Sequence, residues 1–520
     1  LTTMILQLFL FVTLLLYSVY NVLARKQYYW KKKNVPFVKP TLLFGNYQEH
    51  ILLKQCAAKV ASEICKKYPK EPYIGTFYGM EPALIVQDLE IIKQILTKDF
   101  YYFNGREISN YTHSEKLGNS LNFLGGDRWK VIRSNLTPLF SPAKIKNMFV
   151  LINDSAKQFE EFLKVKTKMS RNVNVQSALR KFTMNCIISS AFGIDAKTME
   201  VNADDNLFIT MGDKIFDSTP SYKLRLICRA MWPTIFYGLG FKLFDTHIYT
   251  FFKDLFVKVS KTRQEVKSNR NDFVDLILEW GNKSHISCDS LSNYKTGEKK
   301  LFKIPVDNDL LVAQSIAIFG GGFETTSITL TFLLYELAKN KLKQERLIQE
   351  VDSYIHRHNG VIEYECVNEM PYLEACINET LRLYPATGIL TREVMDDCTL
   401  LTGLQLEKEI RIHIPTYHIH RDPRNFPEPE TFLPERFLDE ERKNIKPFSF
   451  IPFGEGPRIC IGQRFAKMPM FTGLLTIFKN YTVELAYNTP QKIKYNPSSI
   501  VLQPISDIYL QFSPRHINQL

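Results

Sequence analysis

The spacing of apolar and polar residues separates an N-terminal apolar stretch from a long amphipathic remainder. Residues 4–23, MILQLFLFVTLLLYSVYNVL, carry no charged side chain, and a helix needs about 20 mostly apolar residues to cross a bilayer. Basic residues follow at once, at positions 25–26 and 31–33. Positive charge on that flank predicts a transmembrane anchor with the rest of the chain in the cytosol. The alternative is a cleaved signal peptide, which would carry its charge before the apolar run.

Beyond the anchor the pattern changes twice. Residues 24–44 contain two prolines, in VPFVKPTLLFGN, and predict a stiff linker that sets the angle between anchor and globular part. The stretch YIGTFYGMEPALIVQD has branched and aromatic residues broken by glycines and a proline, which is typical of strands and a turn. From about residue 89 the apolar spacing is mostly helical. We therefore expect residues 45–520 to form one mainly α-helical domain with a small β-rich part.

One long apolar stretch, residues 306–340, predicts a central helix with an unusual middle. Asp307 is suited to cap its N-terminus. Three glycines at 320–322 stand beside Glu324 and Thr325, although each glycine inside a helix costs roughly 1 kcal/mol relative to alanine. The plain interpretation is a kinked helix with its acid turned to solvent. The functional interpretation is a groove where a ligand approaches the backbone and an acid–hydroxyl pair relays protons.

Residues 221–245 allow two interpretations. The stretch SYKLRLICRAMWPTIFYGLGFKLFD mixes aromatic, apolar and basic residues, and its proline and glycines argue against a continuous helix. The segment is either a pair of core helices or a stretch that lies on a membrane surface.

Charge and cysteine content exclude several classes of protein. The formal net charge is +12, yet no basic tract is interleaved with aromatic residues. Nucleic-acid binding therefore has no support, and anionic lipid or an acidic protein is the expected partner. The nine cysteines include no CxxC pair. This argues against a disulfide framework or a zinc module and indicates a reducing compartment.

The stretch FGEGPRICIGQRF, residues 453–465, carries the most specific chemistry. Cys460 lies in a glycine-rich turn between Arg458 and Arg464, just before an expected helix. One interpretation is an inert thiol, since free cysteine is often buried. The other is a metal-binding thiolate, because helix N-terminal amides and nearby arginines stabilise the charged form. A single thiolate fits heme iron, whereas zinc needs three or four protein ligands and no partner cysteine or histidine has suitable spacing.

Other pairs of side chains are weaker signals. Glu379 and Arg382 are three residues apart and share a helix face, and Arg436 follows in the proline-flanked FLPERF. Trp129 and Arg133 share another helix face, where an indole N–H and a guanidinium could bind carboxylates. Taken singly, each of these favours a structural role.

Together, these motifs resemble one family. WKVIR, GGFETT, ETLR, PERF and FGEGPRICIG, in this order along the chain, resemble the cytochrome P-450 superfamily. Its heme-binding pattern F-x-x-G-x-x-x-C-x-G is matched in full by Phe453, Gly456, Cys460 and Gly462. The resemblance covers nearly the whole chain. YLEACINETLRLYP, HIHRDPRNFPEPETFLPERF and WKVIRSNLTPLFSPAKIKNM are similar to the insect family-6 microsomal monooxygenases.

The resemblance implies the cytochrome P-450 fold, preceded by the transmembrane helix, and heme b (iron protoporphyrin IX) with Cys460 as thiolate ligand. It also implies roles for the other motif residues. The heme propionates would be bound by Trp129, Arg133, Arg392 and Arg458, with Arg106 a weaker match. A buried charge network that holds the heme-side core would be formed by Glu379, Arg382 and Arg436. Protons would be delivered by Glu324 and Thr325.

Two positions depart from the family pattern. Gly321 stands where alanine is common, which would loosen the central helix and widen the pocket beside it. Pro469 lies inside the helix expected after Cys460, where a proline removes an amide donor and clashes with the preceding turn. We expect a kink near Phe465.

The implied activity is that of a membrane-anchored heme-thiolate monooxygenase on the cytosolic side of the endoplasmic reticulum. It would insert one atom of dioxygen into apolar organic substrates such as plant allelochemicals or insecticides, with hormone metabolism as an alternative. Electrons would come from NADPH through a separate NADPH–cytochrome P-450 reductase, with cytochrome b5 as a further partner, because the chain shows no dinucleotide-binding fingerprint. The expected docking residues for an acidic reductase are Lys130, Lys446 and Arg464.

Substrate and reaction type leave alternatives open. Pocket walls are expected from residues 103–125, 205–245, 311–325 and 386–392 and from the turn near Ile500. One alternative activity is a heme-thiolate isomerase or dehydratase that rearranges a peroxide without a reductase, against which the acid–threonine pair argues. The other is a heme-based binding or sensing protein that forms no reductase-dependent product.

Overall fold

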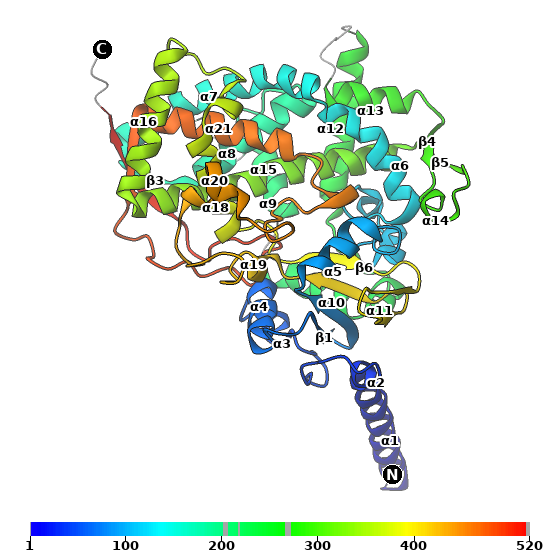
Figure 1. Ribbon diagram of the computed structural model, residues 1–520. Coiled ribbons are helices and arrows are strands. Elements are labelled where there is room, and N and C mark those ends of the chain that lie inside the picture. The colour runs from blue at the N-terminus through cyan, green and yellow to red at the C-terminus, as the bar shows by residue number, and fades with distance from the viewer. Residues whose placement is uncertain (1, 201–205, 217–218, 266–271, 516–520) are drawn as a thin grey trace.

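The computed structural model describes residues 2–200, 206–216, 219–265 and 272–515. They form a mainly helical body with small sheets, from which an N-terminal helix extends (Figure 1). The longer helices are α1 (Thr2–Gln27), α4 (Ala57–Lys67), α6 (Gly126–Leu136), α7 (Pro142–Met169), α8 (Val175–Ile187), α10 (Pro220–Met231), α12 (Thr246–Glu265), α15 (Asn308–Lys339), α16 (Lys341–Arg357), α18 (Pro371–Leu383) and α21 (Gln463–Asn480). The shorter helices are α2 (Tyr29–Lys32), α3 (Gln48–Ile51), α5 (Leu89–Lys93), α9 (Leu207–Ile215), α11 (Pro233–Gly238), α13 (Phe273–Gly281), α14 (Asn293–Thr296), α17 (Cys366–Glu369), α19 (Thr416–Ile419) and α20 (Asp439–Lys443). Tighter or wider helical turns are η1 (Gln94–Lys98), η2 (Ser109–Ser114), η3 (Lys116–Asn119), η4 (Thr137–Phe140), η5 (Ile188–Phe192), η7 (Pro434–Phe437) and η8 (Gly456–Arg458).

The β-rich part consists of small separate sheets. The largest has the order β1 (Tyr73–Tyr78), β2 (Glu81–Val86), β9 (Arg411–Ile414), β6 (Leu390–Glu393). The others are β10 (Tyr481–Leu485), β11 (Tyr509–Pro514) and β3 (Asn172–Asn174); β4 (His285–Asp289) and β5 (Leu301–Pro305); and β7 (Cys398–Thr399) and β8 (Gln405–Leu406). The predicted strands and turn after the linker are confirmed as β1 and β2, which pair antiparallel. β2 runs parallel to β9, and β6 pairs antiparallel with β9, so that Arg392 lies on an edge strand opposite Ile412.

α15 is the central helix of the body (Figure 1). The predicted helix and its cap are confirmed: the Asp307 carboxylate accepts a hydrogen bond of 2.7 Å from the Leu310 amide. Most of the α15 side chains are buried in the main core, where the helix contacts α8, α18 and α21. Within the described ranges it is the one helix whose length and hydropathy would suit a membrane crossing, but most of that stretch is buried inside the protein. α15 is therefore a core helix.

The segment after α1 is docked on the body. We call residues 28–44 the collar. Trp30 of the collar is fully buried, and its indole nitrogen donates to the Thr76 carbonyl of β1 at 2.8 Å. A Cβ on Gly75 would clash with the Trp30 ring, so the glycine allows this close contact. Lys33 adds an ion pair of 2.9 Å with Glu407. The described apolar stretch of α1 is Ile5–Leu14, and the anchor at residues 4–23 and the linker at 24–44 stay predictions.

α10 and α11 cover the stretch 221–245 as far as Gly238, and the predicted helix break is confirmed at Trp232 between them. One side of the pair is buried, with Ile227 and Met231 packed in the core cluster of α3, α4 and β1. The other side exposes Leu224, Ile235, Leu239 and Phe241. Both helices lie in the part of the body from which α1 extends (Figure 1). The segment thus combines a core-facing side with an exposed apolar side.

α21 follows the candidate ligand turn and contains Pro469. It continues as one helix past this residue. Because proline has no amide proton, the Phe465 carbonyl one turn earlier lacks its usual helical donor. The helix is therefore continuous, and the kink near Phe465 stays a prediction.

Candidate functional site

Cys460 lies at the end of a tight turn that requires glycine. Gly454 and Gly456 have φ angles of +75° and +72°, a region that residues with a side chain rarely adopt. A Cβ on Gly456 would also clash with the carbonyl oxygen of Leu96. The Cys460 amide closes the turn by donating to the Phe453 carbonyl at 2.9 Å. α21 begins three residues later, at Gln463, which confirms the helix predicted after the thiol.

The thiol of Cys460 borders space inside the protein. Cys460 is exposed, yet burial among protein atoms is the main cause that raises its pKa. A hydrogen bond from the Gly462 amide lowers the pKa of the thiol and so favours the thiolate. The positive charges of Arg133 and Arg106 act in the same direction to a smaller extent. Over the described ranges, no group of three or more His, Cys, Asp or Glu side chains could share a metal ion. Cys460 is therefore suited to be the single protein ligand of a prosthetic group.

Four arginines gather beside this thiol. The pKa of Arg458 is held well below its usual range. Burial is the largest cause, and the positive charges of Arg106, Arg392 and Arg133 add to it. Burial and the charge of Arg106 lower the pKa of Arg392 to about 9. Burial also lowers the pKa of Arg106 and of Arg133, and the Cys460 charge opposes this in both. We call these four residues the arginine cluster.

The arginine cluster keeps hydrogen-bond donors without partners. The Nε atoms of Arg106, Arg392 and Arg458 are buried and make no hydrogen bond. Arg458 donates from Nη2 to the Leu124 carbonyl, and its guanidinium carbon lies 4.8 Å from the ring centroid of Trp129. Buried cations with free donors are stable only beside an anion. The two carboxylates of heme would supply that charge, so these residues fit the group.

The residues predicted to hold the propionates are close together in the fold. The four residues predicted to bind propionates lie together, and they are Trp129, Arg133, Arg392 and Arg458. Arg106, the weaker match, lies with them. Arg392 lies on an edge strand and is paired with Ile412, so only the folded sheet brings it to the turn of Cys460. The assignment of these residues to heme stays a prediction.

The three glycines of α15 differ in their surroundings. A Cβ on Gly322 would lie 2.6 Å from Ile187 of α8, and one on Gly320 would lie 3.4 Å from Ile215. These two glycines therefore allow helices to pack closely. Gly321 is exposed, and a Cβ there would meet no atom within 4 Å. α15 runs through all three without a break, so the open space beside Gly321 does not interrupt the helix.

Glu324 and Thr325 do not bond to each other. The Thr325 hydroxyl donates to the Gly321 carbonyl at 3.0 Å. Glu324 is 2% exposed, and its carboxylate accepts a hydrogen bond of 2.6 Å from Arg180 Nε and another from the Gln503 amide. The acid is thus held between α8 and the C-terminal turn.

Sequence analysis missed both partners of Glu324. Arg180 also forms an ion pair with Asp213. Burial by itself would lower the pKa of Arg180, but the negative charges of Glu324 and Asp213 outweigh this effect, so the pKa is raised. Arg180 is 144 positions and Gln503 is 179 positions from Glu324. No local motif marks either residue, so only the fold identifies them.

The predicted pairing of Glu379 with Arg382 is confirmed, and both are fully buried. Arg382 donates to the Glu379 carboxylate from Nε at 2.7 Å and from Nη2 at 2.8 Å, and Arg436 Nε lies 3.5 Å from it. Arg382 also donates to the carbonyls of His420, Pro429 and Thr431. The network joins α18 to the segment 420–437, which favours a structural role.

The segments predicted to wall a substrate pocket lie against one another. Gln314 of α15 accepts a hydrogen bond of 2.9 Å from the Leu121 amide. The Leu502 amide in the C-terminal turn donates to the Ala386 carbonyl at 3.0 Å. Of the predicted walls, the positions outside the described residues are 205 and 217–218.

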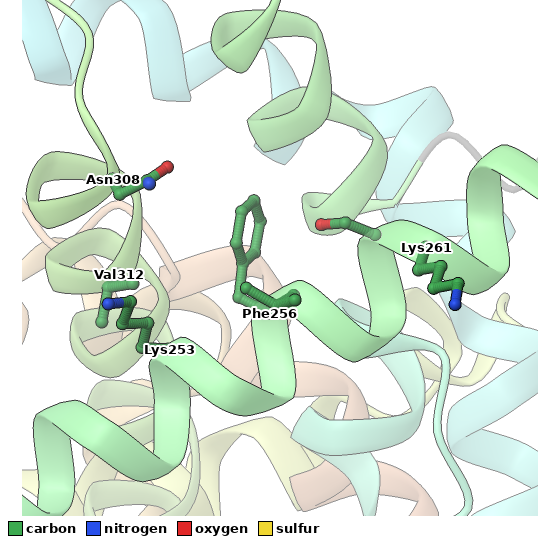
Figure 2. A pocket seen from close by; sticks show the side chains of 7 residues that line it. Lys253, Phe256, Lys261, Asn308 and Val312 are labelled. Carbon is green, nitrogen blue, oxygen red and sulfur yellow. The ribbon is translucent and has the colours of Figure 1, made fainter.

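A surface groove of about 270 Å³ lies between α12 and the start of α15 (Figure 2). Its labelled lining residues are Lys253, Phe256, Lys261, Asn308 and Val312. Lys253 is directed toward Val312 and Lys261 toward the opposite end, so their ammonium groups do not converge (Figure 2). At about 1.5 Å per helical residue, Val312 lies roughly 13 Å from Gly321. The groove is therefore separate from the candidate site.

Known proteins share this arrangement of motifs. The family model described as cytochrome P450 matches residues 35–512. Cytochrome P450 6B2 of Helicoverpa armigera is 32% identical over 505 residues, 97% of this chain and 97% of that protein. Cytochrome P450 6j1 of Blattella germanica is 32% identical over 495 residues, which are 95% of this chain and 95% of that protein. Cytochrome P450 6k1 of the same species is 33% identical over 506 residues, which are 96% of this chain and 95% of that protein. The resemblance to the insect family-6 enzymes is thus confirmed. The chain belongs to the cytochrome P450 family, and it is a P450 monooxygenase whose family membership implies a heme-thiolate cofactor.

Proposed function

We propose that the protein binds heme b beside Cys460 and inserts one atom of dioxygen into organic substrates that are largely apolar. The observation that supports this best is an accessible thiol inside the protein with the arginine cluster next to it. Heme bound there would supply the activation of dioxygen and the transfer of one oxygen atom. The chain would supply the ligand, the groups that hold the propionates, the proton route and the substrate pocket.

Each residue of the heme side has a separate task in this proposal. Cys460 is the metal ligand, and the hydrogen bond from the Gly462 amide moderates the basicity of its sulfur. Phe453 and Gly456 shape the turn that presents the sulfur. The propionates are held by Trp129, Arg133, Arg392 and Arg458, with Arg106 as a further donor.

Proton delivery is assigned to Glu324 and Thr325. The Thr325 hydroxyl sits on the Gly321 carbonyl, next to the open space beside that glycine. Glu324 can move a proton toward this space only by exchanging one of its bonds, to Arg180 or to Gln503. The acid is therefore a controlled proton donor in this proposal, released when one of its two partners moves.

We place the protein on the cytosolic side of the endoplasmic reticulum membrane, with residues 4–23 as anchor, 24–44 as linker and 45–520 as the monooxygenase domain. The exposed apolar side chains of α1 support the anchor. The exposed apolar side of α10 and α11, which includes Leu239 and Phe241, supports a second contact with lipid.

Electrons would reach the heme from NADPH through a separate NADPH–cytochrome P-450 reductase, with cytochrome b5 as a further donor. Of the predicted docking residues, Lys446 and Arg464 are exposed. Lys130 already donates to the Ser290 carbonyl at 3.3 Å and lies 4.6 Å from the Tyr294 ring centroid. Lys446 is exposed but also donates to the Arg424 carbonyl, at 2.6 Å. Charge reversal at Arg464 should therefore raise the reductase KM more than reversal at Lys130.

The substrates proposed are xenobiotics of the kind named above, plant allelochemicals and insecticides. The support is the composition of the predicted wall segments, many of whose residues are aromatic or aliphatic. Such walls bind apolar molecules through burial of surface.

The carbon monoxide difference spectrum of the reduced, heme-loaded protein tests the ligand. The wild-type protein should show the red-shifted band of thiolate ligation, and Cys460→Ser should lose it. Cys398→Ser, which alters a half-buried thiol on β7, should keep it. Persistence of the band in Cys460→Ser would overturn the assignment.

A turnover assay with reductase, NADPH and labelled dioxygen tests the reaction. One labelled oxygen atom should appear in the product and the other in water. Rearrangement of a peroxide without NADPH would instead favour an isomerase, and tight ligand binding without any product would favour a sensing protein.

A further inference from the structure

Lys223 is a buried cation without a partner. It lies in α10, is 2% exposed and is among the largest fully buried side chains. Throughout the described part of the chain, its ammonium group has no hydrogen bond, ion pair or ring contact. The Nζ atom itself keeps some accessible surface, so a ligand can reach it. A charge that is mostly removed from water is stabilised by an opposite charge beside it.

The surroundings of Lys223 supply no negative charge. Burial is the main cause that lowers the pKa of Lys223 to about 8, and the Cys56 thiol opposes this in part. Burial raises the pKa of Cys56, so that thiol is neutral. Burial and the Lys223 charge lower the pKa of His50 to about 3, so that imidazole is neutral as well. At pH 7 a largely protonated ammonium group therefore stands between a neutral thiol and a neutral ring.

The ammonium group lies over an apolar floor. Ile227 and Met231, one and two turns after Lys223, pack in the core cluster of α3, α4 and β1. Helix residues four apart share a face, so Lys223 is directed to the same side of α10. An anion that reached it would have its remaining atoms against this apolar floor.

The floor is continuous with the predicted pocket walls. Cys56 stands directly before α4, and a Cβ on Gly388 would clash with Ala58 of α4 and lie 3.3 Å from Leu502. The start of α4 thus touches both the 386–392 wall and the C-terminal turn. Ile389, from the same wall, packs against the cluster under α10. An apolar surface therefore leads from Lys223 to the walls of the reaction site.

We propose that Lys223 binds the carboxylate of an amphipathic substrate whose apolar body extends along this surface toward the reaction site. The proposal rests on the monooxygenase function and specifies a substrate class for it: long-chain or arylalkyl carboxylic acids. The carboxylate provides the counter-charge that no described residue supplies to Lys223, since Glu49 of α3 and Glu63 of α4 contact Lys54 and Gln55 instead. Oxidation then falls on the end of the molecule remote from the acid.

Dodecanoic acid and its methyl ester separate recognition of the charge from recognition of the chain. Binding of each to the heme-loaded full chain is measured by calorimetry at pH 7. The wild-type protein should bind the acid at least about tenfold more tightly than the ester, the factor expected for one charge-assisted hydrogen bond. Lys223→Met should remove this preference by weakening binding of the acid alone. Lys223→Arg should keep part of it, and Arg225→Met, which removes an exposed cation from the same helix, should keep all of it.

The pH dependence gives a second readout that needs no variant. Only the protonated amine attracts a carboxylate, so affinity for the acid should fall as the pH rises through about 8. Affinity for the ester should stay constant. In Lys223→Met the acid should lose this pH dependence.

Equal affinity of the wild-type protein for acid and ester, or a preference that survives in Lys223→Met, overturns the proposal. The carbon monoxide band and turnover of a neutral substrate are measured on the same preparations. If both are normal while the preference for the acid is absent, the carboxylate site is wrong and the monooxygenase function stands. If the band is absent from the wild-type protein, the proposed function itself fails.

Discussion

At the scale of single residues, the arginine cluster has opposite effects on the protein with and without heme. Its four like charges lie close together, Arg392 and Arg458 are buried, and three of the four keep a free donor. An anion beside the arginines would offset the repulsion between their charges and accept hydrogen bonds from the free donors. Each arginine should therefore stabilise the heme complex and destabilise the apoprotein.

Arg458→Met tests this prediction. Heme should dissociate roughly tenfold to a hundredfold faster, since a hydrogen bond to a charged group contributes about 1.5–3 kcal/mol, as measured by transfer of heme to apomyoglobin. The apoprotein should become more resistant to urea because a buried charge is removed. Arg464→Met, at an exposed position of α21, is the control and should change neither quantity. Faster heme loss without a more stable apoprotein would contradict mutual repulsion within the cluster.

A second prediction at this scale concerns neighbouring glycines of α15. Gly321→Ala should raise the free energy of unfolding by about 1 kcal/mol, because alanine favours the helix and its methyl group meets open space. Gly322→Ala should lower it by about 1–3 kcal/mol, because its methyl group would be pressed against Ile187. Urea unfolding of the two variants in parallel provides the measurement. An equal effect of both would show that packing against α8 does not distinguish the two positions.

The candidate site residues that can be predicted from the sequence are those whose chemistry is local. Cys460 and its glycines, and the acid–threonine pair, are adjacent in the chain and can be recognised as motifs. Arg180, Gln503 and Lys223 cannot, because each matters only for what lies beside it after folding. A lysine in an amphipathic segment is usually exposed to solvent. Lys223 becomes a candidate binding residue only because the fold buries its side chain.

At the scale of elements, the network around Glu379 ties α18 to the irregular segment 420–437. The Arg382 guanidinium makes five hydrogen bonds, and three of them are accepted by backbone carbonyls that belong to no helix or strand. Irregular backbone inside a protein needs such partners, since unpaired carbonyls cannot reach water. The network therefore substitutes for secondary structure in this region.

Arg382→Met should lower the free energy of unfolding by about 3–5 kcal/mol, because it leaves the buried Glu379 carboxylate without its main partner. Thermal unfolding of the heme-loaded protein measures the loss. Lys443→Met, which breaks an exposed pair with Glu440, serves as control and should cost at most about 1 kcal/mol. A loss of the same size in both variants would mean that the network is not structural.

Elements were predictable where the pattern was periodic and local. The long helix, its cap and the β1–β2 pair follow from apolar spacing and turn residues. The parallel pairing of β2 with β9 does not, because more than 300 residues separate the partners Leu84 and Ile412. The break between α10 and α11 at Trp232 could be predicted, because proline and glycine residues mark it in the sequence. Which side of the two helices is buried and which is exposed follows only from the fold.

At the scale of the whole molecule, two exposed apolar segments lie at the same end of the protein. α1 and the exposed side of α10 and α11 lie in the same part of the protein (Figure 1). If this end meets lipid, removal of residues 1–27 should weaken membrane binding without abolishing it. Flotation of the truncated, heme-loaded protein with lipid vesicles measures the remaining binding.

The double variant Leu239→Asp and Phe241→Asp, made in the truncated protein, should remove most of that remaining binding, since both side chains are exposed. Leu342→Asp and Val361→Asp, at exposed apolar positions elsewhere on the body, form the matched control and should leave it unchanged. Full release of the truncated protein from vesicles would show that α1 is the sole membrane contact.

The collar has a consequence for electron transfer. Trp30 fixes the chain after α1 to β1, and Lys33 fixes it to Glu407, so the collar would not act as a free swivel if α1 is a membrane anchor. With α1 in a bilayer, every molecule would present Lys446 and Arg464 at the same height and orientation above the membrane. A membrane-bound reductase would then meet its docking surface by diffusion in two dimensions. The length of the collar, rather than any residue of the heme site, would set how well the two proteins are aligned.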